Sequence, residues 1–180
     1  MAAYPFASHD DGSYERARSA EAVSRRRRFE NLLARHERRL RRVAFGMLGD
    51  PHRVDDVLQE AFVRAYRSLP DHFDSADREA AWLYRIVHRS CLNELRSRRR
   101  SRESLGLPEE LIDVRGVTAD SVAIAAALAQ LSVEGRAVVL LVDVVGLDYD
   151  TAAAALQVPR GTVASRLNTA RAALRELLDA

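Results

Sequence analysis

Residues 54–69 read VDDVLQEAFVRAYRSL, and this stretch decides the fold class. Its apolar side chains recur at i, i+3, i+4, i+7 and i+8, the spacing of one helix face, while most charged and amide side chains fall outside that stripe. The turn Gly49-Asp50-Pro51 precedes the stretch and Pro70 follows it. Because both flanks stop a helix, the stretch predicts one amphipathic helix that buries a single face.

The same periodicity predicts a helix on each side of this one. Residues 25–48 carry an apolar stripe that ends at the Gly49 turn, and residues 82–96 carry another that runs into the arginine-rich stretch 96–102. Residues 71–77 between them are polar and are predicted to form a connecting loop.

The C-terminal part is also predicted to be helical. An alanine-rich helix is expected up to Leu131, followed by a helix over residues 133–145 with Ser132 as its N-cap. Val138–Val142 taken alone resembles a buried strand, but no second strand is nearby to pair with it. Two further helices, 149–156 and 162–178, are joined by a tight turn and predict a helix-turn-helix.

These elements predict an all-α fold of two small helical domains joined by a flexible linker. The expected boundaries are a disordered N-terminal arm at 1–24, a first domain at 25–100, a linker at 101–120 and a second domain at 121–180.

Charge is unevenly distributed, although the net charge is only +2. Residues 25–102 contain 20 arginines against 11 acidic residues, whereas residues 125–180 contain 5 against 6. A polyanionic partner is therefore expected to bind the first domain.

Several classes of function are disfavoured. The longest apolar runs are far shorter than the ~18 residues of a membrane span, no secretory signal is visible, and Cys91 is the only cysteine, so membrane insertion is not expected and the cytoplasm is the expected location. The five histidines lack metal-ligand spacing. The sequence shows no nucleophile paired with a base, no phosphate-binding loop and no pair of carboxylates in a pocket pattern. It therefore gives no reason to expect catalysis, a cofactor or a small-molecule substrate.

Five segments now resemble two domains of one family. Residues 49–66 and 82–102 are similar to domain 2 of bacterial RNA polymerase sigma factors, and residues 131–136, 146–149 and 158–171 are similar to domain 4. Their order and short linker resemble the extracytoplasmic-function (ECF) class, over about residues 27–178. The resemblance implies that the chain binds core RNA polymerase and promoter DNA, and that an anti-sigma protein regulates it.

The resemblance implies that the outward face of the helix at 54–69 docks on a coiled coil of the largest polymerase subunit. The residues carried over are Asp55, Asp56, Gln59 and Glu60. The alternative is a solvated helix face with i, i+4 ion pairs such as Glu60 with Arg64.

The resemblance further implies that the third helix binds the promoter element that is melted, with the loop 73–78 capturing an unstacked base. The expected contacts are Arg85, His88, Arg89, Asn93 and Arg96, with Arg98, Arg99 and Arg100 holding phosphates. Trp82 is predicted to pack in the core rather than to stack on a base.

The last helix is expected to read a distal promoter element as duplex. The candidates are Thr162, Ser165, Arg166, Asn168, Thr169 and Arg171. Family members usually have Lys or Arg where this chain has Ala164, so binding by this domain alone is expected to be weak.

Two other functions fit part of the sequence. A stand-alone helix-turn-helix regulator accounts for residues 149–178, but it leaves the acidic second helix and the basic third helix without a role and predicts a dimer. A scaffolding helical protein fits the periodicity alone.

Overall fold

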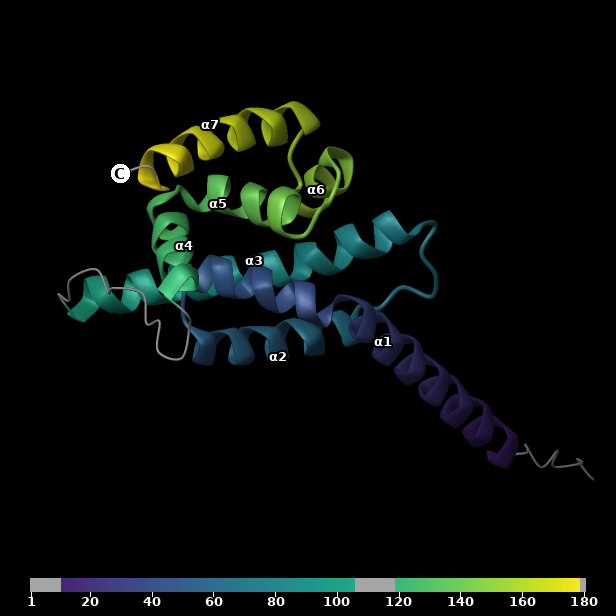
Figure 1. Cartoon of the computed structure of the whole chain (residues 1–180). Coiled ribbons are helices and arrows are strands. Elements are labelled where there is room, and N and C mark those ends of the chain that lie inside the picture. Colours follow the sequence, from purple (N-terminus) through teal and green to yellow (C-terminus); the bar gives the residue numbers. More distant parts are fainter. Residues whose placement is uncertain (1–10, 106–118, 179–180) are drawn as a thin grey trace, which may run out of the picture. The chain divides into compact units, whose positions relative to one another are not determined.

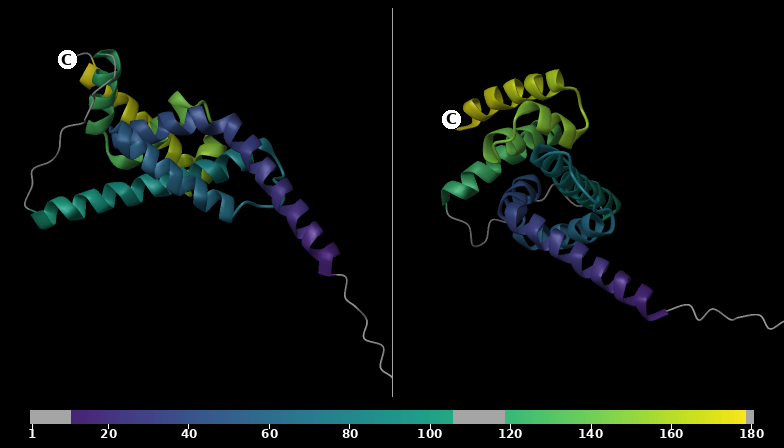
Figure 2. Two further views of the ribbon diagram at one scale, coloured as in Figure 1. Left: turned by 90° about the horizontal axis from the view of Figure 1, so that it is seen from below. Right: turned by 90° about the vertical axis from the view of Figure 1, so that its right-hand side faces the viewer.

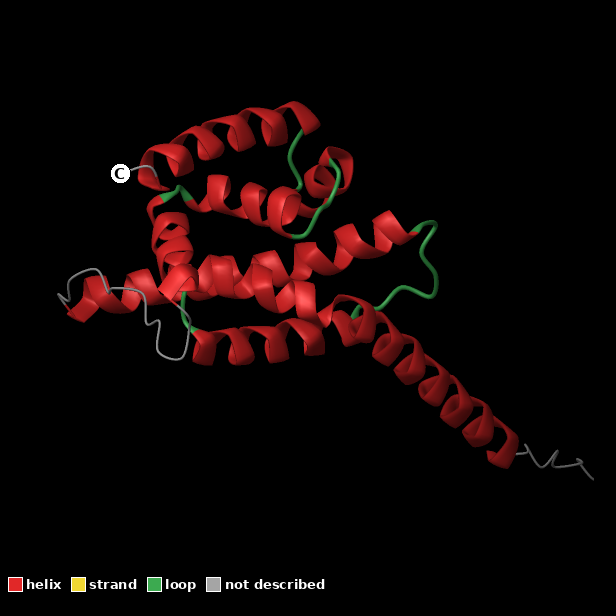
Figure 3. Cartoon of the chain, in the orientation of Figure 1, coloured by secondary structure: helices red, strands yellow, loops and turns green. Residues whose placement is uncertain are grey.

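The computed structural model describes residues 11–105 and 119–178, and every regular element in these ranges is a helix (Figure 3). This confirms the predicted all-α fold. The chain divides into two compact units, with the boundary after Arg35. The second unit begins at His36 and includes helices from both predicted domains.

Helix α1 spans Asp11–Leu48. The structure here differs from the expectation of a disordered arm at 1–24, because residues 11–24 are helical and residues 1–10 lie outside the described residues. Residues 13–24 contain no Gly or Pro and are rich in Ala, Glu and Arg, which favour helix. Gly49, at φ 69°, ends the helix as predicted.

Helices α2 (Pro51–Arg67) and α3 (Ala76–Leu105) pack side by side (Figure 2). Asp50 caps α2, because its carboxylate accepts from the backbone N–H of His52 at 3.0 Å and of Arg53 at 3.3 Å; such a cap contributes about 1 kcal/mol. Most of the predicted apolar stripe of each helix is buried. Leu58, Leu83 and Val87 are at most 2% exposed.

Helix α4 spans Ala119–Gln130, and α5 (Val133–Val139) continues directly into a π-helical turn, η1 (Leu140–Val144). The predicted N-cap is confirmed, since Ser132 Oγ accepts from Gly135 N at 3.1 Å. The strand-like run Val138–Val142 is helical, as expected from its lack of a strand partner. The predicted linker at 101–120 overlaps helices at both ends, because α3 extends to Leu105 and α4 begins at Ala119. Residues 106–118 lie outside the described residues.

Helices α6 (Tyr149–Leu156) and α7 (Arg160–Leu178) form the predicted helix-turn-helix, with α7 beginning two residues earlier than expected (Figure 1). Asp148 caps α6 by accepting from Thr151 N at 2.7 Å. Both α5 and α6 pack against α7, and Val163 and Leu167 of α7 are fully buried. Gln157 ends α6 at φ 57°, a left-handed conformation.

Helix α3 also packs against α6 (Figure 1), and His88 lies half-buried on α3. Burial, together with the nearby charges of Arg89 and Arg96, lowers the pKa of His88 to about 4, although Glu134 of α5 opposes the shift. Because the folded chain disfavours protonated His88, stability due to this residue is present above the ordinary pKa of about 6.5 and is lost as the pH falls towards 4.

We therefore expect the free energy of unfolding to fall between pH 6.5 and pH 4 more steeply in the native chain than in a His88→Gln variant. The expected difference is about 1 kcal/mol, because partial exposure reduces the effect of the shift. Urea unfolding followed by circular dichroism at several pH values measures it. Parallel pH profiles of the two proteins would show that His88 titrates normally.

Candidate functional site

The acidic face of α2 consists of Asp55, Asp56, Gln59 and Glu60, all exposed. Two of its carboxylates are already paired: Asp55 with Arg41 of α1, and Glu60 with Arg64 at 2.5 Å. Asp56 forms no ion pair with any described residue. The face thus has features of both interpretations of the sequence. Glu60 and Arg64 form the i, i+4 pair of a solvated helix face, whereas the Asp56 carboxylate can bind a partner.

Val63 extends the acidic face of α2 and was missed at the sequence level. It is 50% exposed, and it lies one helical turn after Gln59 and Glu60. The sequence signal was its position outside the apolar stripe of an otherwise regular helix. An exposed aliphatic side chain beside carboxylates can add apolar contact area to a protein interface.

The predicted promoter-binding residues of α3 fall into two groups. The first group, Arg85, His88 and Arg89, lies on the part of α3 that packs against α6. Arg85 donates to the backbone oxygen of Ala154 at 2.7 Å from Nη2 and 3.2 Å from Nε, and Arg89 donates to Oε1 of Gln157. These arginines are therefore engaged by the helix-turn-helix.

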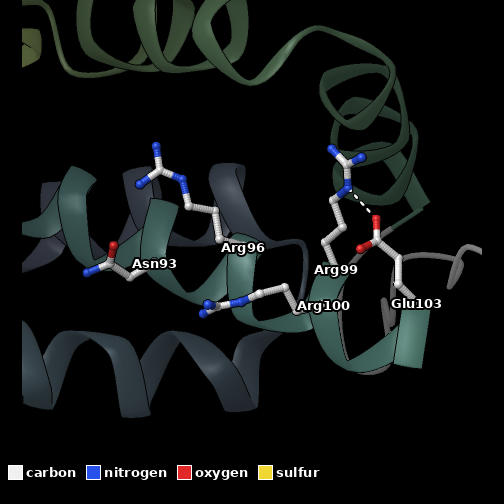
Figure 4. A pocket seen from close by; sticks show the side chains of 5 residues that line it. All are labelled: Asn93, Arg96, Arg99, Arg100 and Glu103. Carbon is white, nitrogen blue, oxygen red and sulfur yellow. Dashed lines mark hydrogen bonds and ion pairs between the residues drawn. The ribbon is translucent and has the colours of Figure 1, made fainter. Parts of the chain in front are cut away.

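The second group lines an open pocket of about 500 Å³ near the C-terminal end of α3 (Figure 4). Asn93, Arg96, Arg99 and Arg100 lie here together with Glu103. Arg99 is paired with Glu103 at 2.8 Å, whereas Arg96 and Arg100 have no ion-pair partner among the described residues. Arg98 is half-buried and lies outside this lining.

A second pocket, of about 640 Å³, lies at the loop between α2 and α3. Phe73 and Trp82 contribute aromatic rings whose centroids are 5.3 Å apart. Asp150 of α6 and its N-cap Asp148 complete the wall together with Arg85. The prediction that Trp82 packs in the core is wrong, because this side chain is half-buried and lines the pocket.

The predicted reading residues of α7 are only partly accessible. Ser165, Asn168 and Thr169 are exposed, whereas Thr162 and Arg166 are half-buried, as is Ala164 between them. The hydroxyl groups of Ser165 and Thr169 donate to backbone oxygens of Thr162 and Ser165, both at 3.1 Å. They satisfy the helix backbone in this state and can rotate to a new acceptor.

Arg171 belongs to the scaffold of the helix-turn-helix. It forms a two-pronged ion pair with Asp143 of the π-helical turn η1, at 2.5 and 3.0 Å. The pairing with Asp143 raises the pKa of Arg171. A π turn inserts one residue and so shifts the phase of the following side chains. Sequence periodicity cannot show such a shift, and Asp143 was missed for this reason.

Arg136 is a further residue whose role sequence reasoning did not find. Its half-buried guanidinium donates to backbone oxygens of Ala129 at 2.6 Å, Leu131 at 3.3 Å and Met47 at 2.8 Å. Burial lowers its pKa. Because Arg136 donates hydrogen bonds to backbone carbonyls at the C-terminal ends of α4 and α1, it holds these helix ends beside α5.

Within residues 11–105 and 119–178, no cluster of His, Cys, Asp or Glu side chains is arranged to hold a metal ion. No helix in this part of the chain has the length and apolar character needed to span a bilayer.

Two family models match the chain in the predicted order. Residues 32–101 match Sigma-70 region 2, and residues 121–174 match Sigma-70, region 4. A stand-alone helix-turn-helix regulator would account for the second match alone.

Similar proteins match most of the chain. The ECF RNA polymerase sigma factor SigM of Mycobacterium tuberculosis is 36% identical over 175 residues, covering 93% of this chain and 87% of that protein. The solved structure of CnrH in complex with the cytosolic domain of CnrY has a TM-score of 0.65 at 32% identity, covering 86% of this chain and 89% of CnrH. The sigma factor RpoE in complex with the anti-sigma factor NepR from Bartonella quintana has a TM-score of 0.73 at 26% identity, covering 84% and 96%.

The chain thus matches both sigma-70 regions, and it matches these relatives over most of its length. The chain belongs to the ECF class of RNA polymerase sigma factors, non-enzymatic proteins that bind core polymerase and direct promoter-specific transcription initiation.

Proposed function

We propose that the acidic face of α2 docks on core polymerase, that α3 and the loop before it bind the melted proximal promoter element, and that α7 contacts the distal element. The observation that carries this proposal is the separation of charge on neighbouring helices. An exposed acidic face on α2 and an arginine-rich surface on α3 belong to helices that pack against each other.

The docking role of α2 is supported by its exposed, incompletely paired groups. Asp56 can accept charge-assisted hydrogen bonds from arginines of a partner without first breaking an ion pair. Asp55 and Glu60 are paired on the surface, where such pairs contribute only ~0–1 kcal/mol, so exchanging their partners costs little. Val63 adds an apolar contact beside them.

The promoter role of α3 is supported by the chemistry of its two pockets. Arg96 and Arg100 offer unpaired guanidinium groups to phosphates. The loop pocket offers the aromatic rings of Phe73 and Trp82, on which an unstacked base can stack. A melted strand needs both kinds of contact, since phosphates give affinity and stacking holds the displaced base.

The distal role of α7 has weaker support. Ser165, Asn168 and Thr169 are exposed and can contact base edges, but Arg171 is committed to Asp143. Few cations therefore remain for the phosphate backbone, and duplex binding by this helix alone is expected to be weak.

We also propose an anti-sigma protein as a regulatory partner and the cytoplasm as the location. Two similar solved structures are sigma factors in complex with the cytosolic domain of CnrY and with the anti-sigma factor NepR. Core polymerase and promoter DNA are in the cytoplasm, and the buried free thiol of Cys91 suits a reducing compartment.

Asp56→Arg tests the docking face. We expect affinity for core polymerase to fall by about tenfold or more, because a like charge then faces the basic partner. Glu176→Arg is the matched control, since Glu176 is an exposed carboxylate on α7 that forms no ion pair with any described residue. Equal affinity of the two variants, measured by fluorescence titration with core polymerase, would contradict the docking assignment.

A double Arg96→Ala, Arg100→Ala variant tests the phosphate contacts. We expect the holoenzyme to bind promoter DNA more weakly, and the slope of log affinity against log salt to flatten by about 1.5, corresponding to two lost phosphate contacts. Arg175→Ala is the control, since Arg175 is an exposed arginine on α7. An unchanged slope in the double variant would mean that this surface does not meet DNA.

Ala164→Arg tests the orientation of α7. If this side of α7 faces DNA, a cation at position 164 should raise affinity for short duplex DNA by about threefold to tenfold at low ionic strength. Fluorescence anisotropy with the isolated chain measures the change. No gain, with helicity preserved, would show that this side of α7 does not face the duplex.

A further inference from the structure

The N-terminal part of α1 takes no part in the surfaces of α2, α3 and α7. Helix α1 begins at Asp11 (purple in Figure 1), and its first part belongs to the compact unit that ends at Arg35. From Arg18 to Arg28 no side chain is buried, and only Arg25 is half-buried. Because this stretch is helical without burying a side chain, its sequence is not explained by packing.

Residues 16–28 are strongly basic, and we call them the arginine segment. They comprise six arginines and one acidic residue. Arg18 and Arg27 form no ion pair with any described residue. Arg26 is paired with Glu30 at 2.8 Å, but both side chains are on the surface, at 76% and 58% exposure. Since a surface pair of this kind exchanges its partner at little cost, the segment presents positive charge to its surroundings.

Four of these arginines form two rows on opposite sides of the helix. Each residue advances by about 100° around an α-helix, because 3.6 residues complete one turn. Arg18 and Arg25 are seven residues apart and therefore lie on one side, two turns from each other. Arg16 and Arg27 are eleven residues apart and lie on the other side, rotated from the first pair by roughly 180°. Positive charge thus runs along both sides of the segment.

The composition of the arginine segment does not suit a protein groove or a bilayer. A helix that binds either of these repeats apolar side chains along one face. The segment has a single large apolar side chain, Val23. It also has no aromatic ring on which an unpaired base could stack, so it is not built for a single strand. A partner with phosphates on both sides of the helix fits its charge best.

The major groove of duplex DNA has this geometry. The groove is about 12 Å wide, an α-helix with its side chains is about 10–12 Å across, and a phosphate backbone runs along each edge of the groove. Ala20 and Ser24 lie one turn apart between the two rows, and their small side chains allow close approach to the groove. Duplex RNA does not fit, because its major groove is too deep and narrow.

We propose that the arginine segment of α1 is a further DNA-binding surface, which lies in the major groove of duplex DNA and holds the phosphates of both strands. It binds without reading sequence, because contacts between arginine and phosphate carry no information about the bases. This surface adds to the affinity of the chain for any duplex. It is independent of the roles proposed for α2, α3 and α7.

The experiment compares the native chain with two fourfold variants. The first removes both rows by Arg16→Ala, Arg18→Ala, Arg25→Ala and Arg27→Ala, and alanine favours the helix, so a loss of binding is not a loss of helix. The matched control replaces the same four arginines by lysine, which keeps the charge. Fluorescence anisotropy measures binding to a mixed-sequence duplex of about 30 base pairs, and to one of its strands, over a range of salt concentrations. Amide hydrogen exchange of the native chain, with and without the duplex, locates the contact.

We expect the alanine variant to bind the duplex about tenfold more weakly at low salt, and its slope of log affinity against log salt to flatten by about 3.6, which is 0.9 for each of four lost phosphate contacts. The lysine variant should keep the native slope. Binding of the single strand should change less, since one backbone cannot contact both rows. Exchange in residues 16–28 should slow when the duplex is added.

An unchanged slope in the alanine variant, or no slowing of exchange in the arginine segment, would overturn the proposal. An equal loss of affinity for duplex and single strand would overturn the placement in the major groove. Weaker binding to core polymerase with unchanged duplex affinity would assign the segment to a protein partner instead. Because none of the four arginines belongs to α2, α3 or α7, each of these results leaves the function proposed for those helices standing.

Discussion

Helix α3 has to bury one side in the core and present arginines to solvent on its other sides. The rest of the structure depends on this division. One side of the helix is completely buried, with Leu83, Tyr84, Val87 and Cys91 at 0% exposure. The other sides carry arginines at intervals from Arg85 to Arg100. Burial of an apolar stripe gives a rigid platform at roughly 25 cal/mol per Å² of apolar surface. The arginines can then be presented at fixed positions without themselves contributing to the core.

The neighbouring helices extend this division of labour. Helix α2 buries its stripe against the same core and directs carboxylates outward, so surfaces of opposite charge occur on adjacent helices. A protein that must join a polymerase to DNA needs this segregation, because a mixed surface would attract neither partner well. Arg171 of the helix-turn-helix instead forms an ion pair with Asp143 of η1, within the fold. The small net charge of the C-terminal part therefore hides charged side chains that pair with each other within the fold.

The sequence was sufficient to predict what depends on local rules. Helix periodicity, the cap at Ser132 and the turn at Gly49 all follow from short-range chemistry, and all are confirmed. Tertiary contacts were not predictable in the same way. The left-handed Gln157 occupies a place where sequence rules lead one to expect glycine, and its partner Arg89 lies 68 residues away. The helical start of α1 was missed because a polar, serine-containing segment was read as an arm although it holds strong helix formers.

The central claim is that this chain joins core polymerase to promoter DNA. Transcription in vitro tests it most directly, with purified core polymerase, a library of promoter fragments and this chain as the only specificity factor. The account predicts discrete transcripts that start at defined positions and appear only when the chain is present. Random initiation that is the same with and without the chain, together with failure of the chain to co-migrate with core polymerase at low salt, would contradict it.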